Sequence, residues 1–213
     1  RAAANQFRYL SAYENWPVYQ NTRVRYFGDG AETLEAMKAD LEKAEKFIFM
    51  EYFIVADGVM WDSIKAVLKE KAAAGVEVRF VYDDLGSVGC LPKQFRKELS
   101  DAGIHVMAFN PFRPALSAVM NNRNHRKITV IDGYIAYTGG FNLADKYINQ
   151  KKRFGHWKDT AIMLKGDAVT GFLMMFLQMW NITEHRTDDY ARYLYRPAAS
   201  NPKEPDGTGF VMP

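Results

Sequence analysis

Hydrophobic residues recur at helical spacing in several segments of the chain. Between positions 31 and 44, the apolar residues Leu34, Met37, Leu41 and Ala44 follow one another at intervals of three or four. This period places them on one face of an amphipathic helix. The same period predicts helices at 61–74, where Gly75 is a natural helix end, and at 91–102 and 167–182.

Runs rich in aromatic and β-branched residues lie between these helices and predict strands. The first run, at 47–55, is almost wholly apolar, as expected of a buried strand. A hairpin is predicted at 127–138, where two short strands meet at Asp132 and Gly133, a pair typical of tight turns. Strands that alternate with helices predict an α/β fold, in which the hairpin makes the sheet mixed and helices flank both faces. The remaining strands are expected at 76–82, 104–109 and 160–164.

The chain has the length and composition of one globular domain with flanking segments. Of its 213 residues, 48% are hydrophobic and 25% are charged, which excludes wholesale disorder. We expect a lead-in at 1–24, a folded domain at 25–195, and a linker rich in proline and glycine at 196–213. Because the chain begins with Arg1 and no signal peptide follows, we expect it to be a piece of a longer protein.

Hydropathy and cysteine content exclude two further classes of structure. No run of 18 or more apolar residues is present, so no segment is expected to cross a membrane unaided. The apolar run at 172–180 is expected to be a buried helix. Cys90 is the only cysteine, so it can form neither an internal disulfide nor a cysteine-based zinc site.

Positive charge is concentrated in two segments, although the formal net charge is only +3. Residues 102–131 contain no acidic residue but carry four arginine or lysine side chains. Residues 146–158 are also free of acids and carry five basic side chains. Such segments are usually solvated faces, but two of them around one motif favour an anionic ligand.

The hairpin segment 123–142 places several reactive side chains close together. His125 and Lys127 are two residues apart, so on a strand both point to the same face. If Asp132 and Gly133 form a two-residue loop, the pairing of the residues on either side of the loop sets the register of the hairpin. That register places Thr138 beside Lys127, Gly140 beside His125, and Asn142 beside Arg123.

Such a patch suits a phosphate group. Lys127 supplies a positive charge and Asn142 donates hydrogen bonds. Gly139 and Gly140 let a ligand approach the backbone. A neutral imidazole is a nucleophile, so His125 could attack phosphorus and form a phosphohistidine. No metal or other cofactor is expected, because Lys127 and Asn142 can neutralise the phosphate oxygens and the histidines lack metal-ligand spacing.

This spacing resembles the HKD signature of the phospholipase D superfamily. The residues that carry the resemblance are His125, Lys127, Asp132, Gly139, Gly140 and Asn142. Flanking segments narrow the resemblance to bacterial cardiolipin synthases. These segments are 123–127 (RNHRK), 51–54 (EYFI), the turn 83–87 (DDLGS) and 157–159 (WKD), and the similarity extends from residue 25 to residue 183.

The resemblance implies a catalytic set within this region. His125 would be the nucleophile or its acid–base partner, and Lys127 would act beside it on the phosphate. Asp132, the third residue of the HKD set, would support the motif structurally. Asp159 matches the carboxylate that holds the histidine in this superfamily. Glu51 lies within a predicted buried strand, where an unpaired carboxylate is unfavourable, so it is expected at a sheet edge, in an ion pair or supporting the site.

The resemblance also implies that Lys127 and Asn142 bind phosphate. Gly139, Gly140 and Arg123 complete the expected phosphate-binding set. Members of the superfamily carry two such motifs, or one motif in each chain of a homodimer, and this chain has one. The linker at 196–213 would then lead to a missing second half, and the folded domain at 25–195 would be a catalytic domain.

The leading hypothesis for function is one catalytic half of a cardiolipin synthase. It would transfer a phosphatidyl group between two phosphatidylglycerol molecules and release glycerol through a phosphohistidine. Its partners would be phosphatidylglycerol and other anionic phospholipids, the membrane surface, and a second motif-bearing half in the same chain or a homodimer partner. The family places such enzymes at the bacterial cell membrane, with the catalytic part on the cytoplasmic side. The single-motif chain is expected to be nearly inactive as a monomer.

Two other functions remain as alternatives. A nuclease or a hydrolytic phospholipase D would use water as the acceptor on the same motif, although nucleic acid is not expected as a partner. A non-enzymatic module would bind anionic lipid through the basic segments. Asp83 and Asp84 are expected to form a structural turn rather than a magnesium site. The loop 111–120 mixes apolar residues with Arg113, so it is expected either to contact lipid or to pack ordinarily.

Overall fold

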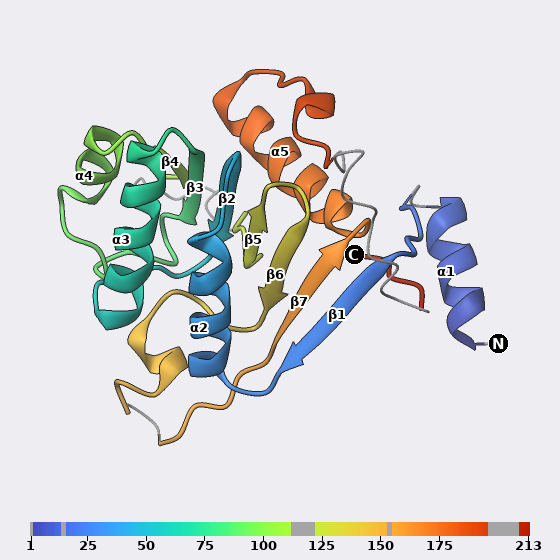
Figure 1. Ribbon diagram of the computed structural model, residues 1–213. Coiled ribbons are helices and arrows are strands. Elements are labelled where there is room, and N and C mark those ends of the chain that lie inside the picture. The colour runs from blue at the N-terminus through green and yellow to red at the C-terminus, as the bar shows by residue number, and fades with distance from the viewer. Residues whose placement is uncertain (1, 14–15, 112–121, 153–154, 196–208) are drawn as a thin grey trace.

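Seven strands form one sheet in the computed structural model, which describes residues 2–13, 16–111, 122–152, 155–195 and 209–213 (Figure 1). The strands lie side by side in the order β1-β7-β6-β5-β2-β3-β4. Their bounds are Thr22–Phe27 for β1, Phe47–Tyr52 for β2, Glu77–Asp83 for β3, His105–Phe109 for β4, Ile128–Ile131 for β5, Ile135–Gly139 for β6 and Ala161–Gly166 for β7.

One part of the sheet is parallel and the other is antiparallel. Strands β2, β3 and β4 run parallel, and a helix joins each one to the next, because parallel neighbours need a crossover connection. From β2 through β5, β6 and β7 to β1, every neighbouring pair is antiparallel. The hairpin of β5 and β6 therefore makes the sheet mixed, as predicted.

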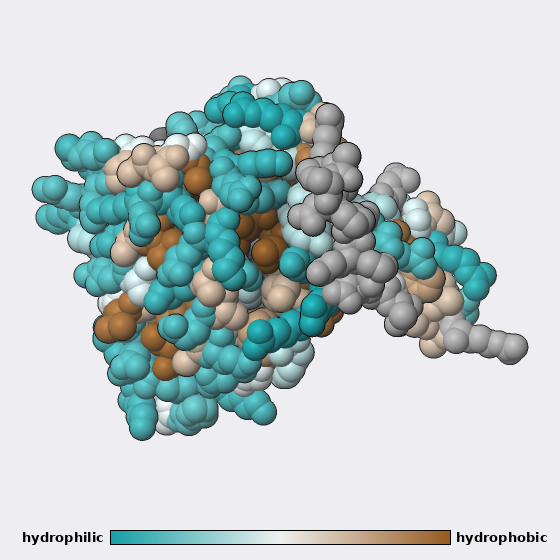
Figure 2. Space-filling model, in the orientation of Figure 1, coloured by the Kyte–Doolittle hydropathy of each residue, from teal (hydrophilic) through white to brown (hydrophobic). Residues whose placement is uncertain are grey.

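Helices cover both faces of the sheet. Helices α2 (Gly30–Leu41), α3 (Val59–Ala73) and α4 (Phe95–Asp101) pack on one face through one hydrophobic cluster (Figure 1). Helix α5 (Val169–Glu184) covers the opposite face through a second cluster. On the side facing the viewer, the molecular surface is largely hydrophilic (Figure 2). The predicted α/β fold with helices on both faces is confirmed.

Burial on both faces explains the unbroken apolar run of β2. All six residues of the strand are buried. Ile48 and Met50 belong to the cluster under α2 and α3, whereas Phe47 and Phe49 belong to the cluster under α5. Successive side chains of a strand point to opposite faces, so both sets must be apolar. Glu51 departs from this pattern, and its partners lie in the candidate site.

Helix α5 contains the apolar run at 172–180. Its buried residues include Phe172, Leu173 and Phe176, and the ring of Phe176 stacks on Phe49 with 4.9 Å between the ring centroids. The expectation of a buried helix is confirmed. Within the described ranges, no helix combines the length and the apolarity that crossing a bilayer requires.

The expected lead-in at 1–24 contains a helix and the start of a strand, and neither was predicted. Helix α1 spans Ala2–Tyr13, and β1 pairs with β7 along its whole length, from Thr22 to Phe27. The expected domain boundary between residues 24 and 25 therefore falls inside a strand. The four middle residues of β1 are exposed at the edge of the sheet, although Val24 and Tyr26 alternate with arginines as in a half-buried strand.

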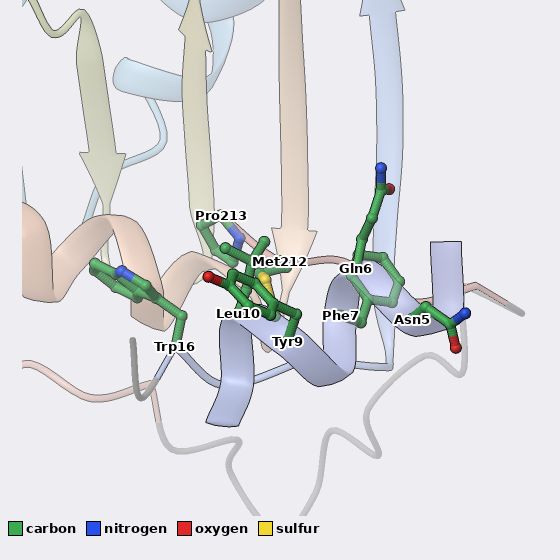
Figure 3. A pocket seen from close by; sticks show the side chains of 8 residues that line it. All are labelled: Asn5, Gln6, Phe7, Tyr9, Leu10, Trp16, Met212 and Pro213. Carbon is green, nitrogen blue, oxygen red and sulfur yellow. The ribbon is translucent and has the colours of Figure 1, made fainter. Parts of the chain in front are cut away.

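The described C-terminal residues return to the N-terminal segment. Val211 forms an antiparallel bridge with Tyr19, so this end of the expected linker is joined to the folded part of the chain. Beside this bridge, residues of α1 and residues Trp16, Met212 and Pro213 line a groove of about 750 Å³ (Figure 3). Residues 196–208 of the expected linker and 112–120 of the expected lipid-contact loop lie outside the described residues.

Candidate active site

Four segments meet at the carboxyl ends of β2 and β3, the edge at which ligands commonly bind to α/β sheets. The Ile54 backbone N–H, just after β2, donates to Oδ1 of Asn142, which follows β6, at 2.9 Å. The Asn124 backbone N–H, just before β5, donates to Oδ2 of Asp83, at the end of β3, at 3.0 Å. These two links bring much of the predicted HKD region to one edge of the sheet.

His125 and Lys127 lie together, as their spacing predicts. Lys127 Nζ is 3.1 Å from His125 Nδ1 and donates to the His125 backbone carbonyl at 2.5 Å. The His125 side chain is exposed, whereas Lys127 is only 5% exposed. The contact occupies Nδ1 and leaves Nε2 as the ring nitrogen that can meet a substrate.

The environment of Lys127 weakens the hydration of its charge. Burial lowers the pKa of Lys127 below its ordinary value, and the negative charge of Asp159 opposes this shift. A partly desolvated ammonium interacts more strongly with an anion than a fully hydrated one does. The pair therefore combines an exposed imidazole with a cation that can attract a phosphate oxygen.

The hairpin register differs from the predicted one by one residue. The ladder pairs Ile131 with Ile135 and Ile128 with Thr138. The loop is therefore the three residues 132–134 and not the expected pair, although Tyr134 N–H still donates to the Ile131 carbonyl across the turn. The Asp-Gly signal marks the turn, but it does not specify how soon the ladder resumes.

This shift changes which residues lie opposite the catalytic segment. The ladder begins with Ile128 opposite Thr138, so it gives Lys127 no partner, although Thr138 Oγ1 donates to the Lys127 carbonyl at 2.9 Å. His125 lies before the first residue of β5, so no ladder pair places it beside Gly140. The predicted register was wrong because it assumed a two-residue loop.

Asn142 is buried and bonded at both ends of its amide. Its Oδ1 accepts from Ile54 N–H, and its Nδ2 donates to the Tyr147 hydroxyl at 2.8 Å. The side chain is 2% exposed. Asn142 thus joins the segment after β2 to the segment after β6, and in this structure its amide is directed to protein partners.

Gly139 and Gly140 are needed for close packing. A Cβ at Gly139 would overlap the Thr160 carbonyl, and a Cβ at Gly140 would overlap Oδ1 of Asp159. Both contacts bring the end of β6 against the segment that leads into β7. The glycines therefore allow backbone approach, as expected, but here the approaching group is Asp159 or its neighbour Thr160.

Asp159 does not bond to the imidazole, contrary to the expectation. Its Oδ2 accepts from Trp157 Nε1 at 3.2 Å, and its Oδ1 accepts from Thr160 N–H at 2.8 Å. Nδ1 of His125 is occupied by Lys127 instead. Asp159 therefore acts on the site through its charge, which favours the protonated form of Lys127.

Asp132 lies at the opposite end of β5 from His125. Its carboxylate accepts three backbone N–H groups, those of Glu45, Lys46 and Phe47, each at 2.8 Å. Its backbone is in the left-handed region, with φ of 52°. Asp132 thus joins the hairpin turn to the start of β2 and does not contact His125 or Lys127.

Replacing Asp132 by alanine is expected to destabilise the fold without removing a reacting group. We expect the free energy of unfolding to fall by about 1–3 kcal/mol, because three donors lose their acceptor and water replaces it only in part. Asp132→Asn should cost less, because it keeps one acceptor oxygen and tolerates the left-handed backbone. Urea unfolding measures both changes. Loss of the chemistry at unchanged stability in Asp132→Ala would instead assign Asp132 a direct role.

Glu51 holds the segment on which His125 lies. Its Oε1 accepts from Asn124 Nδ2 at 2.5 Å and from Arg126 Nε at 2.7 Å. Glu51 has no exposed surface, and this burial raises its pKa, an effect that Arg126 and Asn124 oppose. Because Asn124 and Arg126 flank His125 in the chain, one carboxylate restrains the backbone on both sides of the imidazole.

Arg123 is directed to the end of β3 and not to Asn142, where the predicted register placed it. Its Nη1 donates to the Asn110 carbonyl at 3.0 Å and to Asp83 Oδ1 at 3.3 Å. Asp83 also accepts from the Gly86 backbone N–H at 2.9 Å, as expected of a structural turn. Among the described residues, no group of three histidine, cysteine or acidic side chains could hold a metal ion.

Two aromatic residues of the site are not singled out by the hydrophobic pattern. The ring of Phe53 lies 4.7 Å from the imidazole of His125, centroid to centroid. The Tyr147 hydroxyl binds the amide of Asn142. Phe53 ends an apolar run that is indistinguishable from core, so the only signal for it is its place in the segment 51–54.

Comparison with known proteins identifies the family. The sequence model of the family described as cardiolipin synthase, PLD-like domain, matches residues 37–180. An uncharacterized protein of Streptococcus mutans is 47% identical over 209 residues, which cover 98% of this chain and 44% of the relative. A cardiolipin synthase of Geobacillus sp. is 44% identical over 165 residues, covering 77% of this chain and 33% of the relative. The chain thus spans less than half the length of these relatives.

Solved structures share the fold. Nuc from Salmonella typhimurium, a phospholipase D family member, has a TM-score of 0.57 at 18% identity, covering 78% of this chain and 95% of that one. NucT from Helicobacter pylori has a TM-score of 0.56 at 12% identity, covering 75% of this chain and 96% of that one. At these identities the likeness concerns the fold alone. The sequence matches, which are far stronger, show that the chain belongs to the cardiolipin synthase family with a PLD-like domain.

Proposed function

We propose that this chain is one catalytic half of a cardiolipin synthase. It transfers a phosphatidyl group from one phosphatidylglycerol molecule to another and releases glycerol through a phosphohistidine on His125. The observation that carries this proposal is the exposed imidazole against the buried ammonium of Lys127, with 3.1 Å between Nζ and Nδ1. Family membership supports a phosphatidyltransferase built on this pair.

The segment that carries His125 is held from two sides, which favours a precise direction of attack. Glu51 binds the side chains of Asn124 and Arg126, and Asp83 binds the backbone of Asn124. Reactions of oriented groups gain rate because little rotational freedom remains to be lost at the transition state. The exposed imidazole can thus meet a substrate from solvent while its backbone stays in place.

In the first step, Lys127 turns its ammonium from Nδ1 to the phosphate, and His125 takes the tautomer that has its proton on Nδ1. Nε2 then attacks phosphorus, and the bond from phosphorus to the glycerol oxygen breaks. The leaving oxygen takes a proton from a general acid on the far side, and glycerol departs. Lys127 attracts the non-bridging oxygens, on which negative charge is concentrated. Asn142 assists at those oxygens by exchanging its bond to the Tyr147 hydroxyl for one to phosphate.

In the second step, a hydroxyl of another phosphatidylglycerol attacks the phosphohistidine. Its proton passes to the group that acted as acid before, and the phosphorus–nitrogen bond breaks, which restores His125. The charge of Asp159 favours the ammonium form of Lys127 throughout. The acid–base group belongs to a second HKD motif, in the rest of the protein or in a homodimer partner.

The substrates place this chemistry at a membrane surface. Phosphatidylglycerol and other anionic phospholipids are the partners, reached on the cytoplasmic side of the bacterial cell membrane. The basic side chains in 146–158 support this assignment, because clustered cations attract an anionic bilayer.

The whole protein acting on phosphatidylglycerol vesicles is expected to form cardiolipin and glycerol in equal amounts, one of each for two phosphatidylglycerol molecules consumed. Mass spectrometry of the lipid and enzymatic assay of glycerol measure both products, and vesicles of phosphatidylcholine alone are the control. Formation of phosphatidic acid in place of cardiolipin would identify water as the acceptor and contradict the transferase. Cleavage of DNA with neither lipid product would favour the nuclease.

A further inference from the structure

The ring of Phe53 contacts both residues of the proposed reacting pair. Phe53 follows β2 directly, and its ring centroid is 4.7 Å from that of His125, with 54° between the planes. The same ring lies 5.6 Å from Lys127 Nζ, measured to the ring centroid. Such contacts are typical of aromatic pairs and of cations that interact with an aromatic ring.

The turn after β3 determines where this ring lies. A Cβ on Gly86 would overlap the Phe53 carbonyl and would lie 2.8 Å from the nearest ring atom. Ser87 Oγ accepts from Val55 N–H at 3.0 Å and donates to the Phe53 carbonyl at 3.4 Å. The segment 83–87 therefore packs on the segment 51–54, and a glycine at position 86 is what allows the close approach.

We propose that Phe53 is a positioning residue of the active site, whose ring, seated on the Gly86–Ser87 turn, holds the imidazole of His125 and excludes water from one side of Lys127. This gives a role to two segments, 51–54 and 83–87, that supply no reacting group. Its consequence for turnover rests on the proposed function. The restraint on the imidazole is independent of the proposed function, and it can be measured in this chain alone.

The exposure of His125 is the reason such a support matters. An exposed side chain exchanges among rotamers unless packing favours one of them. Glu51 and Asp83 restrain the backbone near His125, but neither contacts its ring. Phe53 and Lys127 do contact it, and Phe53 is the one that is itself packed against a tight turn. Removal of the ring would leave the imidazole free to turn away from the substrate.

The direct test is nuclear magnetic resonance of the histidine ring in this chain. In the wild type, His125 is expected to show ring-proton shifts displaced by the nearby aromatic ring and one χ1 rotamer. Phe53→Leu should remove the displacement and average the couplings over several rotamers, whereas Phe53→Tyr should keep both signatures. His125→Ala assigns the resonances. Phe210→Leu is the matched control, since Phe210 is 59% exposed and remote in sequence from the site.

A second variant changes the turn on which the Phe53 ring packs. Gly86→Ala is expected to displace Phe53 without changing either reacting residue, and so to weaken both signatures of His125. Phe53 belongs to neither hydrophobic cluster, so Phe53→Leu should fold normally, as far-UV circular dichroism would report. Wild-type shifts and couplings for His125 in Phe53→Leu would overturn the proposal.

In the whole protein, Phe53→Leu is expected to lower kcat by about 10- to 100-fold with KM nearly unchanged, because a misdirected imidazole slows attack without weakening lipid binding. Phe53→Tyr should restore most of the rate. Normal kcat beside the loss of the single rotamer would also overturn the proposal. If the wild type makes no cardiolipin, the proposed function fails, and the rotamer measurement still decides whether Phe53 positions His125.

Discussion

Replacing His125 by alanine in the whole protein is expected to lower the rate of cardiolipin formation by about 10⁴-fold or more, as loss of a covalent nucleophile commonly does. Without an imidazole no phosphohistidine forms, and transfer would need direct attack by one lipid hydroxyl on the phosphorus of another. Lys127 would remain to attract the phosphate, so binding of phosphatidylglycerol should change little. The measurement is the initial rate of cardiolipin formation, together with the dissociation constant for phosphatidylglycerol vesicles.

The control for this variant is a histidine of similar exposure elsewhere in the chain. His105 is exposed at the start of β4, and His105→Ala should keep the wild-type rate. Because the His125 side chain is exposed, His125→Ala should also unfold at nearly the wild-type urea concentration. A rate within tenfold of the wild type in a folded His125→Ala protein would show that the imidazole is not the nucleophile.

The single-motif chain as a monomer is expected to make cardiolipin at less than about a thousandth of the rate of the whole protein, because general acid–base catalysis typically contributes that much. One imidazole cannot lie on both sides of the phosphorus at once. While His125 attacks, the leaving glycerol needs a proton from the opposite side, and His125 cannot supply it. A second motif must therefore come from the rest of the protein or from a symmetric partner.

Turnover measured against chain concentration tests this requirement. If two chains associate, the rate should rise with roughly the square of concentration until the dimer forms, and sedimentation should detect the dimer over the same range. Mixing the wild-type chain with an excess of His125→Ala chain should then suppress the rate, since mixed dimers hold one imidazole. A rate strictly proportional to concentration, from a species that sediments as a monomer, would contradict the half-site argument.

Most elements of the fold follow from periodicity because burial imposes it. Strand β2 is covered on both faces, so its residues form an unbroken apolar run, and α2 buries one face, so its apolar residues recur every three or four positions. Strand β1 and helix α1 escape this reasoning. The middle of β1 is exposed at the sheet edge and α1 buries none of its residues, so burial in the core does not account for the pattern of either element.

For the site, the spacing of His125 and Lys127 was enough to predict that the two side chains would lie together, because the geometry of an extended segment places alternate residues on one face. The spacing of motif residues likewise identified the family. These properties depend on residues close together in the chain, so they can be predicted from the amino-acid sequence.

The hairpin register and the hydrogen-bond partners of the site residues depend on contacts between distant segments, so they could not be predicted from the sequence. The extra loop residue at Tyr134 shifted the register by one residue, so Thr138 lies opposite Ile128. The link between Ile54 and Asn142 spans 88 positions, and the bond between Ser87 and Phe53 spans 34. A buried hydrogen-bonding group bonds to whichever partner the fold brings near it. The packing of whole segments therefore determines whether Asn142 faces a ligand or a backbone N–H. It also determines which carboxylate lies near the imidazole.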